Sequence, residues 1–416
     1  MKDNKIPSPL VSLLPVFVLI LLLFVTIRTF GSDALSGGSQ VCLLVATAVC
    51  VLTGMAGFHR PWKDFELAIT NNIAGVSTAL IILLIIGALS GAWMVSGVVP
   101  TLIYYGIQVI HPHFFLVSTC IICAVVSVMT GSSWTTIATI GIALMGIGKA
   151  QGFSEGWIAG AIISGAYFGD KVSPLSDTTI LASSVTDTPL FTHIRYLMIT
   201  TVPSLVITLI IFTIAGLSHE ATDTGHIAEY TRILSDKFHI SWWLMIVPVV
   251  TAILIARKVP SIITLFVSTA LATVFALIFQ PGLLCEIAGQ GAEGIAALFK
   301  GGMGMLYGGT QLETGNAEIN ELISTRGMAG MMNTIWLIIC AMCFGGAMTA
   351  GGMLGSITSV FVRFTKKRVG MVSSTVASGL FLNLATADQY ISIILTGNMF
   401  KDIYSCLLYT SPSPRD

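Results

Sequence analysis

Residues 77–110 read STALIILLIIGALSGAWMVSGVVPTLIYYGIQVI, an apolar run interrupted by glycine and proline. As one straight helix this run would extend about 50 Å, since an α-helix rises about 1.5 Å per residue. The hydrocarbon core of a bilayer is only about 30 Å thick. Gly87, Gly91, Gly97 and Pro100 offer places to interrupt the helix. The run therefore predicts a discontinuous helix or a re-entrant hairpin, which a membrane protein tolerates only where the break lines a cavity or packs on protein.

The composition extends this prediction to the whole chain. Of the 416 residues, 54% are hydrophobic and 10% are charged, against roughly 25% charged residues in soluble domains. Lipid must therefore be the solvent for most of the surface. Spans of about 20 apolar residues are expected near residues 9–30, 40–58, 77–110, 114–148, 154–171, 193–215, 242–256, 259–280, 295–312, 331–360 and 369–400. We expect an all-α polytopic membrane protein of about ten to eleven spans, forming a single transmembrane domain over residues 1–404.

Charge and cysteine content exclude other classes of protein. Lys+Arg and Asp+Glu both number 20, so the net charge is zero and nothing indicates that the protein binds nucleic acid. We expect membrane lipid as its main partner. Two CxxC pairs, Cys120/Cys123 and Cys340/Cys343, could in principle supply a four-thiolate zinc site. Because both pairs lie inside apolar runs, packing of buried thiols is the preferred interpretation.

An internal repeat at a constant offset of 255 residues organises the chain. Glu66-Leu67-x-x-Thr70-x-x-x-Ala74-Gly75 recurs as Glu321-Leu322-x-x-Thr325-x-x-x-Ala329-Gly330, and Gly91-Ala92 and Gly97 recur as Gly346-Ala347 and Gly352. The matches are sparse, and glycine shared by chance is the alternative. We expect repeat one over about 40–190 and repeat two over about 295–404.

The basic residues predict that the two repeats are inverted. Loop 59–63 is basic and its counterpart near 314–318 is not, whereas loop 363–368 is basic and its counterpart 108–113 is not. By the positive-inside rule, the halves then lie upside down relative to each other. Inverted repeats with paired broken helices are typical of secondary transporters, with the binding site between the repeats.

Two polar interruptions of the apolar pattern are the candidate sites. In the first, residues 168–179 read FGDKVSPLSDTT, and proline at 174 breaks the helix and frees backbone carbonyls. Carboxylate, hydroxyl and carbonyl oxygens are ligands for hard cations such as Na+. The candidate ion-binding and proton-coupling residues of this cluster are Asp170, Ser173, Ser176, Asp177, Thr178 and Thr179. An interfacial Asp170–Lys171 pair in an ordinary polar turn is the structural alternative.

The second interruption, NLATADQY at 383–390, lies in the other repeat. Its candidate residues are Asn383, Thr386, Asp388 and Gln389. The 255-residue offset places it against an uncharged polar segment, GSSWTT at 131–136, whose residues Gly131, Ser132, Ser133, Thr135 and Thr136 are predicted to form a supporting broken helix. Carboxylates inside a bilayer are unfavourable by roughly 2.5–3.5 kcal/mol on insertion scales, so their presence indicates function.

These three segments, GSSWTT, GAYFGDKVSPLSDTT (165–179) and NLATADQY, resemble the NhaC-type Na+/H+ antiporter family over nearly the whole chain. The resemblance implies exchange of Na+ for H+ across a bacterial plasma membrane within a superfamily of inverted-repeat ion transporters. Some relatives exchange organic acids, such as malate against lactate, with Na+ and H+, and this alternative stays open.

The mechanism expected from these residues is competition. Desolvation disfavours the charged form of a carboxylate, so a proton and a Na+ ion should exclude each other at Asp177, with Asp170 or Asp388 assisting. We expect Na+ at Asp177 and Asp388, small cations and membrane lipid as partners, no cofactor, and a chain that can form a homo-oligomer.

Enzymatic alternatives fail on their motifs, and the end of the chain departs from the family pattern. An intramembrane aspartyl protease would need Gly where Tyr167 stands before Phe168-Gly169-Asp170, and no HExxH occurs. After Tyr404 the sequence reads SCLLYTSPSPRD, which predicts a non-native tail at 405–416. The repeat places a counterpart of 173–179 at 428–434, so repeat two is expected to be truncated.

Overall fold

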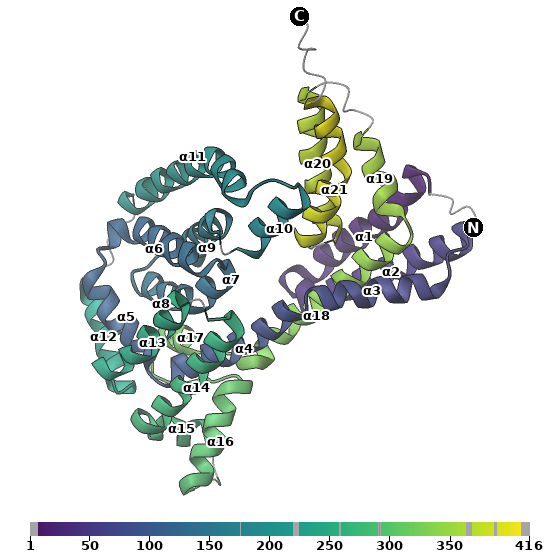
Figure 1. Cartoon of the computed structure of the whole chain (residues 1–416). Helices are drawn as coiled ribbons and strands as arrows, with labels where there is room; N and C mark the ends of the chain where they lie inside the picture. Colours follow the sequence, from purple (N-terminus) through teal and green to yellow (C-terminus); the bar gives the residue numbers. More distant parts are fainter. Residues whose placement is uncertain are drawn as a thin grey trace, which may run out of the picture. The chain divides into compact units, whose positions relative to one another are not determined.

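The computed structural model describes residues 7–174, 176–218, 224–257, 259–289, 291, 293–362, 368–386 and 389–408. Every regular element in these ranges is a helix (Figure 1), and Thr310 and Thr325 add an isolated antiparallel bridge. The predicted all-α fold is confirmed. The chain divides into two compact units, each assembled from separate stretches: unit 1 from 1–80, 181–188 and 333–416, and unit 2 from 81–180 and 189–332.

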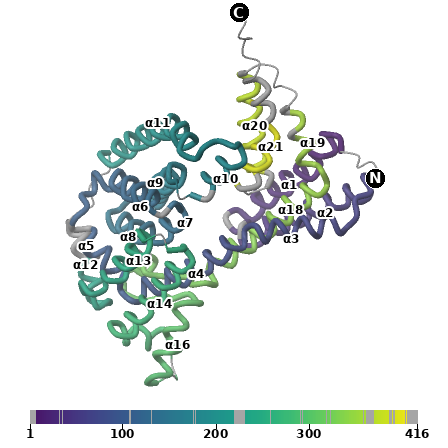
Figure 2. Tube along the Cα trace, in the orientation of Figure 1, coloured from purple at the N-terminus to yellow at the C-terminus, as the bar shows by residue number. Residues whose placement is uncertain are grey.

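Unit 1 combines the start of the chain with its last third. Its helices are α1 (Pro9–Phe30), α2 (Gly38–Leu52), α3 (Trp62–Gly75), α18 (Gly327–Ala350), α19 (Met353–Val362), α20 (Arg368–Thr386) and α21 (Gln389–Leu408), with a 3₁₀ turn η1 (Gly31–Ser36) and a π-helical turn η2 (Thr53–Gly57). α1 packs on α2 and α19, and α20 and α21 run side by side (Figure 2). α21 continues to Leu408, so the helical pattern extends past Tyr404, where the sequence predicted it to stop.

Unit 2 contains the middle of the chain. Its helices are α4 (Ser77–Val95), α5 (Val98–Val109), α6 (Phe115–Thr130), α7 (Ser133–Thr136), α8 (Ile142–Ala150), α9 (Glu155–Val172), α10 (Asp177–Val185), α11 (Leu190–Leu217), α12 (Thr224–Lys237), α13 (Ile246–Ala256), α14 (Ser261–Phe279), α15 (Pro281–Ala288), α16 (Gly294–Tyr307) and α17 (Ala317–Ile323), with 3₁₀ turns η3 (Pro112–Phe114) and η5 (Trp242–Met245) and a π-helical turn η4 (Ile137–Gly141). Three helices cross the unit boundaries: α4 and α10 each have residues in both units, and so does α18.

Large apolar side chains cover the outside of the long helices. Phe17 on α1 and Ile199 on α11 are each 64% exposed, and Ile207 on α11 is 58% exposed. A water-soluble protein rarely exposes contiguous apolar surface of this kind, whereas lipid solvates it. The chain is a multi-pass membrane protein.

The number of full-length spans is lower than predicted. Among the described residues, seven helices are long and apolar enough to cross a membrane, or up to eight if the bent pair Thr231–Lys237 and Trp242–Ala256, which meet at 92°, forms one span. The predicted ranges 154–171, 295–312 and 369–400 contain α9, α16 and α20, which are not among these seven helices. Residues 77–110 form a 19-residue helix and a 12-residue helix, which is the discontinuous helix that the sequence predicts.

The backbone breaks where a residue without a side chain permits it. Gly97 separates α4 from α5 with a left-handed φ of 85°, a conformation that favours glycine. Gly87 and Gly91 were further candidates for this break, but they lie inside α4. A Cβ on Gly91 would lie 1.9 Å from the carbonyl oxygen of Met305. These glycines therefore allow close approach to a neighbouring backbone and do not interrupt the helix.

The helix boundaries follow the 255-residue offset. α4 ends at Val95 and α5 begins at Val98, and 255 residues later α18 ends at Ala350 and α19 begins at Met353. Gly352, the counterpart of Gly97, is also left-handed, with φ of 68°. α20 and α21 follow the offset to within one residue of the α6–α7 boundary. These helix ends thus recur at the predicted offset, while the two repeats, their bounds and their inverted orientation stay predictions.

Candidate functional site

The break between α9 and α10 gathers a carboxylate and several hydroxyls. α9 ends at Val172, and Pro174 lacks the amide hydrogen that another helical turn requires. The amide of Ser173 still donates to the carbonyl of Gly169 at 2.9 Å. The predicted break at this proline is confirmed, and it leaves Asp170 in the last turn of α9.

The carboxylate of Asp170 accepts hydrogen bonds from two serines on different segments. Ser176 Oγ donates to Oδ1 at 2.7 Å, and Ser133 Oγ donates to Oδ2 at 3.0 Å. Both serines are buried, and Asp170 is half-buried. Because a hydroxyl both donates and accepts, each serine can turn its lone pairs toward a cation that reaches the carboxylate. The arrangement offers the oxygen ligands that hard cations prefer.

Ser133 reaches Asp170 because α6 ends in a tight turn. Gly131 adopts a left-handed φ of 68°, and Ser132 is extended at the N-cap of α7, where its Oγ accepts from the amide of Thr135 at 3.3 Å. Thr136 Oγ1 donates to the carbonyl of Ser132 at 3.0 Å. These bonds hold the turn that presents Ser133 as the first residue of α7.

Two threonines near the start of α10 complete the polar break. Ser176 Oγ lies 3.0 Å from Thr178 Oγ1, so a third hydroxyl stands next to the carboxylate's partner. Thr179 Oγ1 lies within hydrogen-bonding distance of the main-chain carbonyls of Asp170, at 3.3 Å, and of Lys171, at 3.1 Å. Carbonyls in the last turn of a helix have no partner within the helix, and Thr179 supplies one.

Close packing of α6 against α9 brings the two breaks together (Figure 1). A Cβ on Gly165 would lie 2.1 Å from the carbonyl oxygen of Cys120, and one on Gly169 would lie 2.4 Å from Ser127 Cβ. Ser173 Oγ also donates to the carbonyl of Val128 on α6 at 2.8 Å. The ends of α6 and α9, and therefore Ser133 and Asp170, are held at one level by these contacts.

Comparison with known proteins places this geometry in a family. The family model described as "Na+/H+ antiporter family" matches residues 165–412, which begin at the glycine of the α6–α9 contact and include Asp170 and Ser176. The chain belongs to the Na+/H+ antiporter family.

Individual members of the Na+/H+ antiporter family match over most of the chain. The Na+/H+ antiporter NhaC of Alkalihalophilus pseudofirmus is 36% identical over 371 residues, covering 88% of this chain and 75% of that protein. The malate-2H+/Na+-lactate antiporter of Bacillus subtilis is 34% identical over 411 residues, 98% of this chain and 83% of that protein. The arginine/ornithine antiporter ArcD of Halobacterium salinarum is 32% identical over 404 residues, covering 96% of this chain and 79% of that protein. All three relatives are antiporters, and the NhaC-type resemblance is confirmed.

The structure joins most of the first predicted cluster. Asp170 and Ser176 contact directly, and Ser173, Thr178 and Thr179 bond to the surrounding hydroxyl and backbone groups. Ser133 was predicted only as part of the supporting broken helix, but its hydroxyl donates directly to the Asp170 carboxylate. Asp177 begins α10, but its side chain lies outside the described part of the chain, so its expected role with Na+ stays a prediction.

The second cluster is described only in part. Asn383 is exposed on α20, and Gln389 is exposed at the first position of α21. Asp388 and the side chain of Thr386 lie outside the described residues. The expected Na+ site at Asp388 therefore stays a prediction of the sequence.

The residues that sequence reasoning missed lie on the α6–α9 contact. Ser127 Oγ donates to the carbonyl of Ala166 at 2.5 Å, and the carbonyl of Val128 receives Ser173. The sequence does contain a pattern that indicates this contact: Gly165 and Gly169 have the small-xxx-small spacing that lets two membrane helices pack closely. Cys120 of the first CxxC pair is buried in this contact, and within the described ranges no three His, Cys, Asp or Glu side chains gather to share a metal ion.

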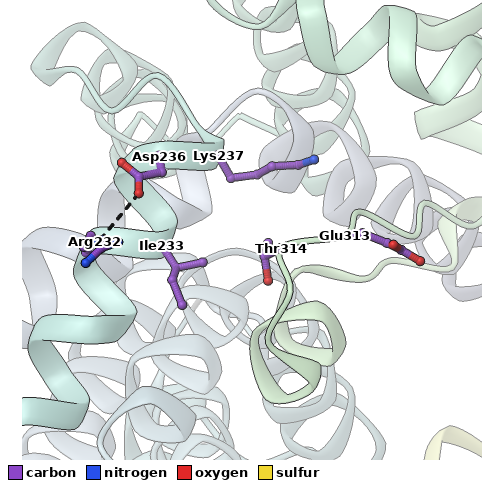
Figure 3. Close-up of a pocket in the computed structure, with 6 residues that line it drawn as sticks. All are labelled: Arg232, Ile233, Asp236, Lys237, Glu313 and Thr314. Atoms are coloured by element: carbon purple, nitrogen blue, oxygen red, sulfur yellow. Dashed lines mark ion pairs between the residues drawn. The ribbon is translucent and has the colours of Figure 1, made fainter.

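A separate cavity of about 520 Å³ lies elsewhere in unit 2 (Figure 3). Its lining residues are Arg232, Ile233, Asp236, Lys237, Glu313 and Thr314. Charges of both signs surround it: Arg232 pairs with Asp236 at 3.8 Å, and Lys237 donates to both carboxylate oxygens of Glu286 at 3.0 Å. None of the residues predicted to bind an ion lines this cavity, so it is distinct from the Asp170 site.

Proposed function

We propose that this protein is a secondary active transporter that exchanges cytoplasmic Na+ for external H+ across a bacterial plasma membrane, with no enzymatic step and no cofactor. The observation that carries the proposal is the Asp170 carboxylate, which accepts hydroxyl donors from two separate chain breaks. Membership of the Na+/H+ antiporter family and the similarity to NhaC support it.

Competition for one carboxylate couples the two ions. Without a cation, Ser176 and Ser133 donate to Asp170 and compensate its charge. A Na+ ion would take the carboxylate and hydroxyl oxygens as ligands, which requires both serines to turn their hydrogens away. A proton on the carboxylate would remove the charge that attracts the ion. Each ion therefore displaces the other, and alternating access to the site converts one gradient into the other.

An organic-acid exchanger is the second candidate. The malate-2H+/Na+-lactate antiporter matches nearly the whole chain at 34% identity. Lys171 follows Asp170 directly and is exposed, so it is the nearest basic residue in sequence for an organic carboxylate. In this case Na+ and H+ would still bind at Asp170, while malate or lactate would be the additional cargo.

The test is Na+-driven proton movement in vesicles that contain the purified protein, followed with a pH-sensitive dye. Asp170→Asn keeps the size of the side chain and removes its charge, so we expect exchange to fall at least a hundredfold, as for loss of a group that binds both ions. Asp236→Asn, an exposed carboxylate of the separate cavity, is the matched control and should behave as wild type. Persistent exchange in Asp170→Asn would overturn the site assignment. Proton movement that requires malate or lactate, and does not respond to Na+ alone, would favour the second candidate.

A further inference from the structure

The charged cavity of unit 2 takes no part in the proposed exchange mechanism. All its lining residues belong to unit 2, and they come from the end of α12 and from the loop before α17 (Figure 3). Its volume of about 520 Å³ lies within the range of cavities that bind small molecules, roughly 300–1,000 Å³. The cavity is therefore large enough for a phospholipid headgroup or a soluble molecule of similar size.

The charges around this cavity leave one carboxylate uncompensated. Lys237 is neutralised by Glu286, to whose two oxygens it donates at 3.0 Å. Arg232 lies 3.8 Å from Asp236. Glu313 is exposed, and in the part of the chain that the structure describes no hydrogen bond or ion pair involves its carboxylate. A ligand of this cavity is therefore expected to bring a positive group for Glu313.

The loop that carries Glu313 is anchored on both sides of this residue. Leu312 is buried, and Thr314 donates to Asn320 Oδ1 from its amide at 2.7 Å and from its hydroxyl at 2.6 Å. Because both neighbours of Glu313 are held in the protein, its side chain is directed outward, to the side of the cavity opposite Arg232 (Figure 3). The anchored loop thus presents this carboxylate to a ligand.

The guanidinium of Arg232 can still receive an anion. Its contact with Asp236 runs through Nε at 3.8 Å, and no other hydrogen bond or ion pair of its side chain occurs among the described residues. The two terminal nitrogens therefore remain for a phosphate or a carboxylate, which a guanidinium binds with two parallel hydrogen bonds. Ile233 and Thr314 lie between this guanidinium and Glu313 (Figure 3). A ligand that bridges the cavity therefore carries an anionic and a cationic group at opposite ends.

The cavity lies near exposed aromatic side chains of the kind found at a membrane surface. Trp242 and Trp243, which begin η5 shortly after α12, are 67% and 66% exposed, and tryptophan is enriched where a membrane meets water. The chain turns by 92° between Thr231–Lys237 and Trp242–Ala256. With the apolar second segment directed into the bilayer, the end of α12 lies along the membrane surface, as interfacial helices do. The cavity is therefore within reach of lipid headgroups.

We propose that this cavity binds the headgroup of a phospholipid with a primary ammonium, phosphatidylethanolamine. Its phosphate binds Arg232 and its ammonium binds Glu313, while its acyl chains lie along exposed apolar residues of α13 such as Val249. The quaternary ammonium of phosphatidylcholine has no hydrogen to donate to a carboxylate, and an anionic headgroup without an amine leaves Glu313 uncompensated. The inference does not depend on which ions the protein exchanges, and neither of its tests measures transport.

The first arm measures lipid binding to the purified full-length chain by native mass spectrometry. The chain is mixed with equal amounts of phosphatidylethanolamine, phosphatidylcholine and phosphatidylglycerol that carry the same acyl chains. We expect one molecule of phosphatidylethanolamine to be retained in preference to the other two lipids. Glu313→Gln and Arg232→Gln should each weaken its binding about three- to tenfold, because each removes a hydrogen bond between charged groups.

The matched controls for this arm are Glu293→Gln and Lys300→Gln, which remove exposed charges outside the cavity. They should leave the binding of phosphatidylethanolamine unchanged. Because all four substituted side chains are exposed, the variants should keep the wild-type melting temperature in detergent, which separates loss of the lipid from loss of the fold. Equal retention of the three lipids, or an unchanged preference in Glu313→Gln, would overturn the proposal.

The second arm locates the lipid. Ile233 lines the cavity and is half-buried, so an Ile233→Cys reporter, with the exposed Cys285 changed to serine, should react with a maleimide above the background of the same chain without the reporter. Phosphatidylethanolamine should slow this labelling several-fold, phosphatidylcholine should slow it less, and adding Glu313→Gln should abolish the protection. Labelling that phosphatidylethanolamine leaves unchanged would overturn the site. Equal protection by glycerophosphoethanolamine, the same headgroup without acyl chains, would show that the cavity binds a soluble zwitterion and would overturn the lipid assignment.

Discussion

At the scale of single residues, the environment of Asp170 explains how a carboxylate can stand in a membrane protein. Charge inside a bilayer is unfavourable unless it is paired or hydrogen-bonded. The two serine hydroxyls supply hydrogen bonds to charge, which are stronger than those between neutral groups. The same hydroxyls can serve as ligands to a cation. The stability of the Asp170 charge in the folded protein and the affinity of the site for a cation therefore depend on the same side chains.

This dual role predicts the effect of removing one hydroxyl. Ser176→Ala takes away the 2.7 Å donor to Asp170, and a hydrogen bond to a charged group contributes about 1.5–3 kcal/mol. We expect the apparent KM for Na+ in the vesicle assay to rise about tenfold or more. Ser235→Ala, which removes an exposed serine whose hydroxyl donates to the carbonyl of Arg232 at 2.8 Å, is the control. A Ser176→Ala variant with wild-type Na+ dependence would contradict the role of the hydroxyl as a ligand.

At the scale of the elements, the contact between α6 and α9 determines which groups meet. Gly165 and Gly169 remove the side chains that would separate the two backbones. Membrane helices gain little from the hydrophobic effect against each other, so van der Waals packing of small residues is what holds them together. The hydroxyls of Ser127 and Ser173 add a hydrogen bond from each helix to the other. The register of this contact sets Ser133 beside Asp170.

Crowding this contact should destabilise the protein. A Cβ on Gly169 would lie 2.4 Å from Ser127 Cβ and 2.5 Å from the amide nitrogen of Val128, and overpacking of this kind typically costs about 1–3 kcal/mol. We expect Gly169→Ala to lower the melting temperature of the purified protein in detergent. Gly156→Ala, on the same helix with no atom within 4 Å, should leave it unchanged or raise it, since alanine is the better helix former. Equal melting temperatures for the two variants would argue against a tight contact.

At the scale of the whole molecule, lipid is the solvent of the apolar surface, as water is the solvent of a soluble protein's surface. Only 6% of the most apolar window of α11 is buried within the protein, although the helix is 28 residues long. Because the surrounding hydrocarbon solvates such a helix, its apolar surface needs no protein partner.

A charge placed on that surface should therefore interfere with insertion. Ile207 lies near the middle of α11 and is 58% exposed, so Ile207→Lys should oppose insertion by about 2.5–3.5 kcal/mol. We expect less protein in the membrane fraction, measured against Ile207→Leu as the control. An undiminished amount of inserted protein would show that this face of α11 does not meet lipid.

Much of the local structure could be predicted because its causes are local. Hydropathy reports the solvent of each segment, and glycine and proline restrict or release the backbone wherever they stand. The helical class, the breaks at Gly97, Gly131 and Pro174 and the 255-residue offset follow from these properties. Glycines are harder to interpret, because a glycine can either break a helix or let another backbone pack closely against it. Gly87 and Gly91 were candidates for a break, but they lie inside α4 and allow such close contacts. The full-length spans were overcounted because an apolar composition does not show where a helix ends: the predicted range 295–312 contains α16, which has only 14 residues.

The sequence by itself determined that this protein is a membrane transporter of the Na+/H+ antiporter type, and it identified Asp170, Ser176 and their neighbours as candidates. Only the tertiary structure decided which of them meet. Ser133 reaches Asp170 from 37 residues earlier in the chain, and α21 reaches the end of α10 from 214 residues later. Such pairs depend on how glycine-lined helices pack, a property of two distant surfaces together. The packing of α6 on α9 brings Ser133 to Asp170. The leading role that the sequence gives to Asp177 stays a prediction, because its side chain lies outside the described part of the chain.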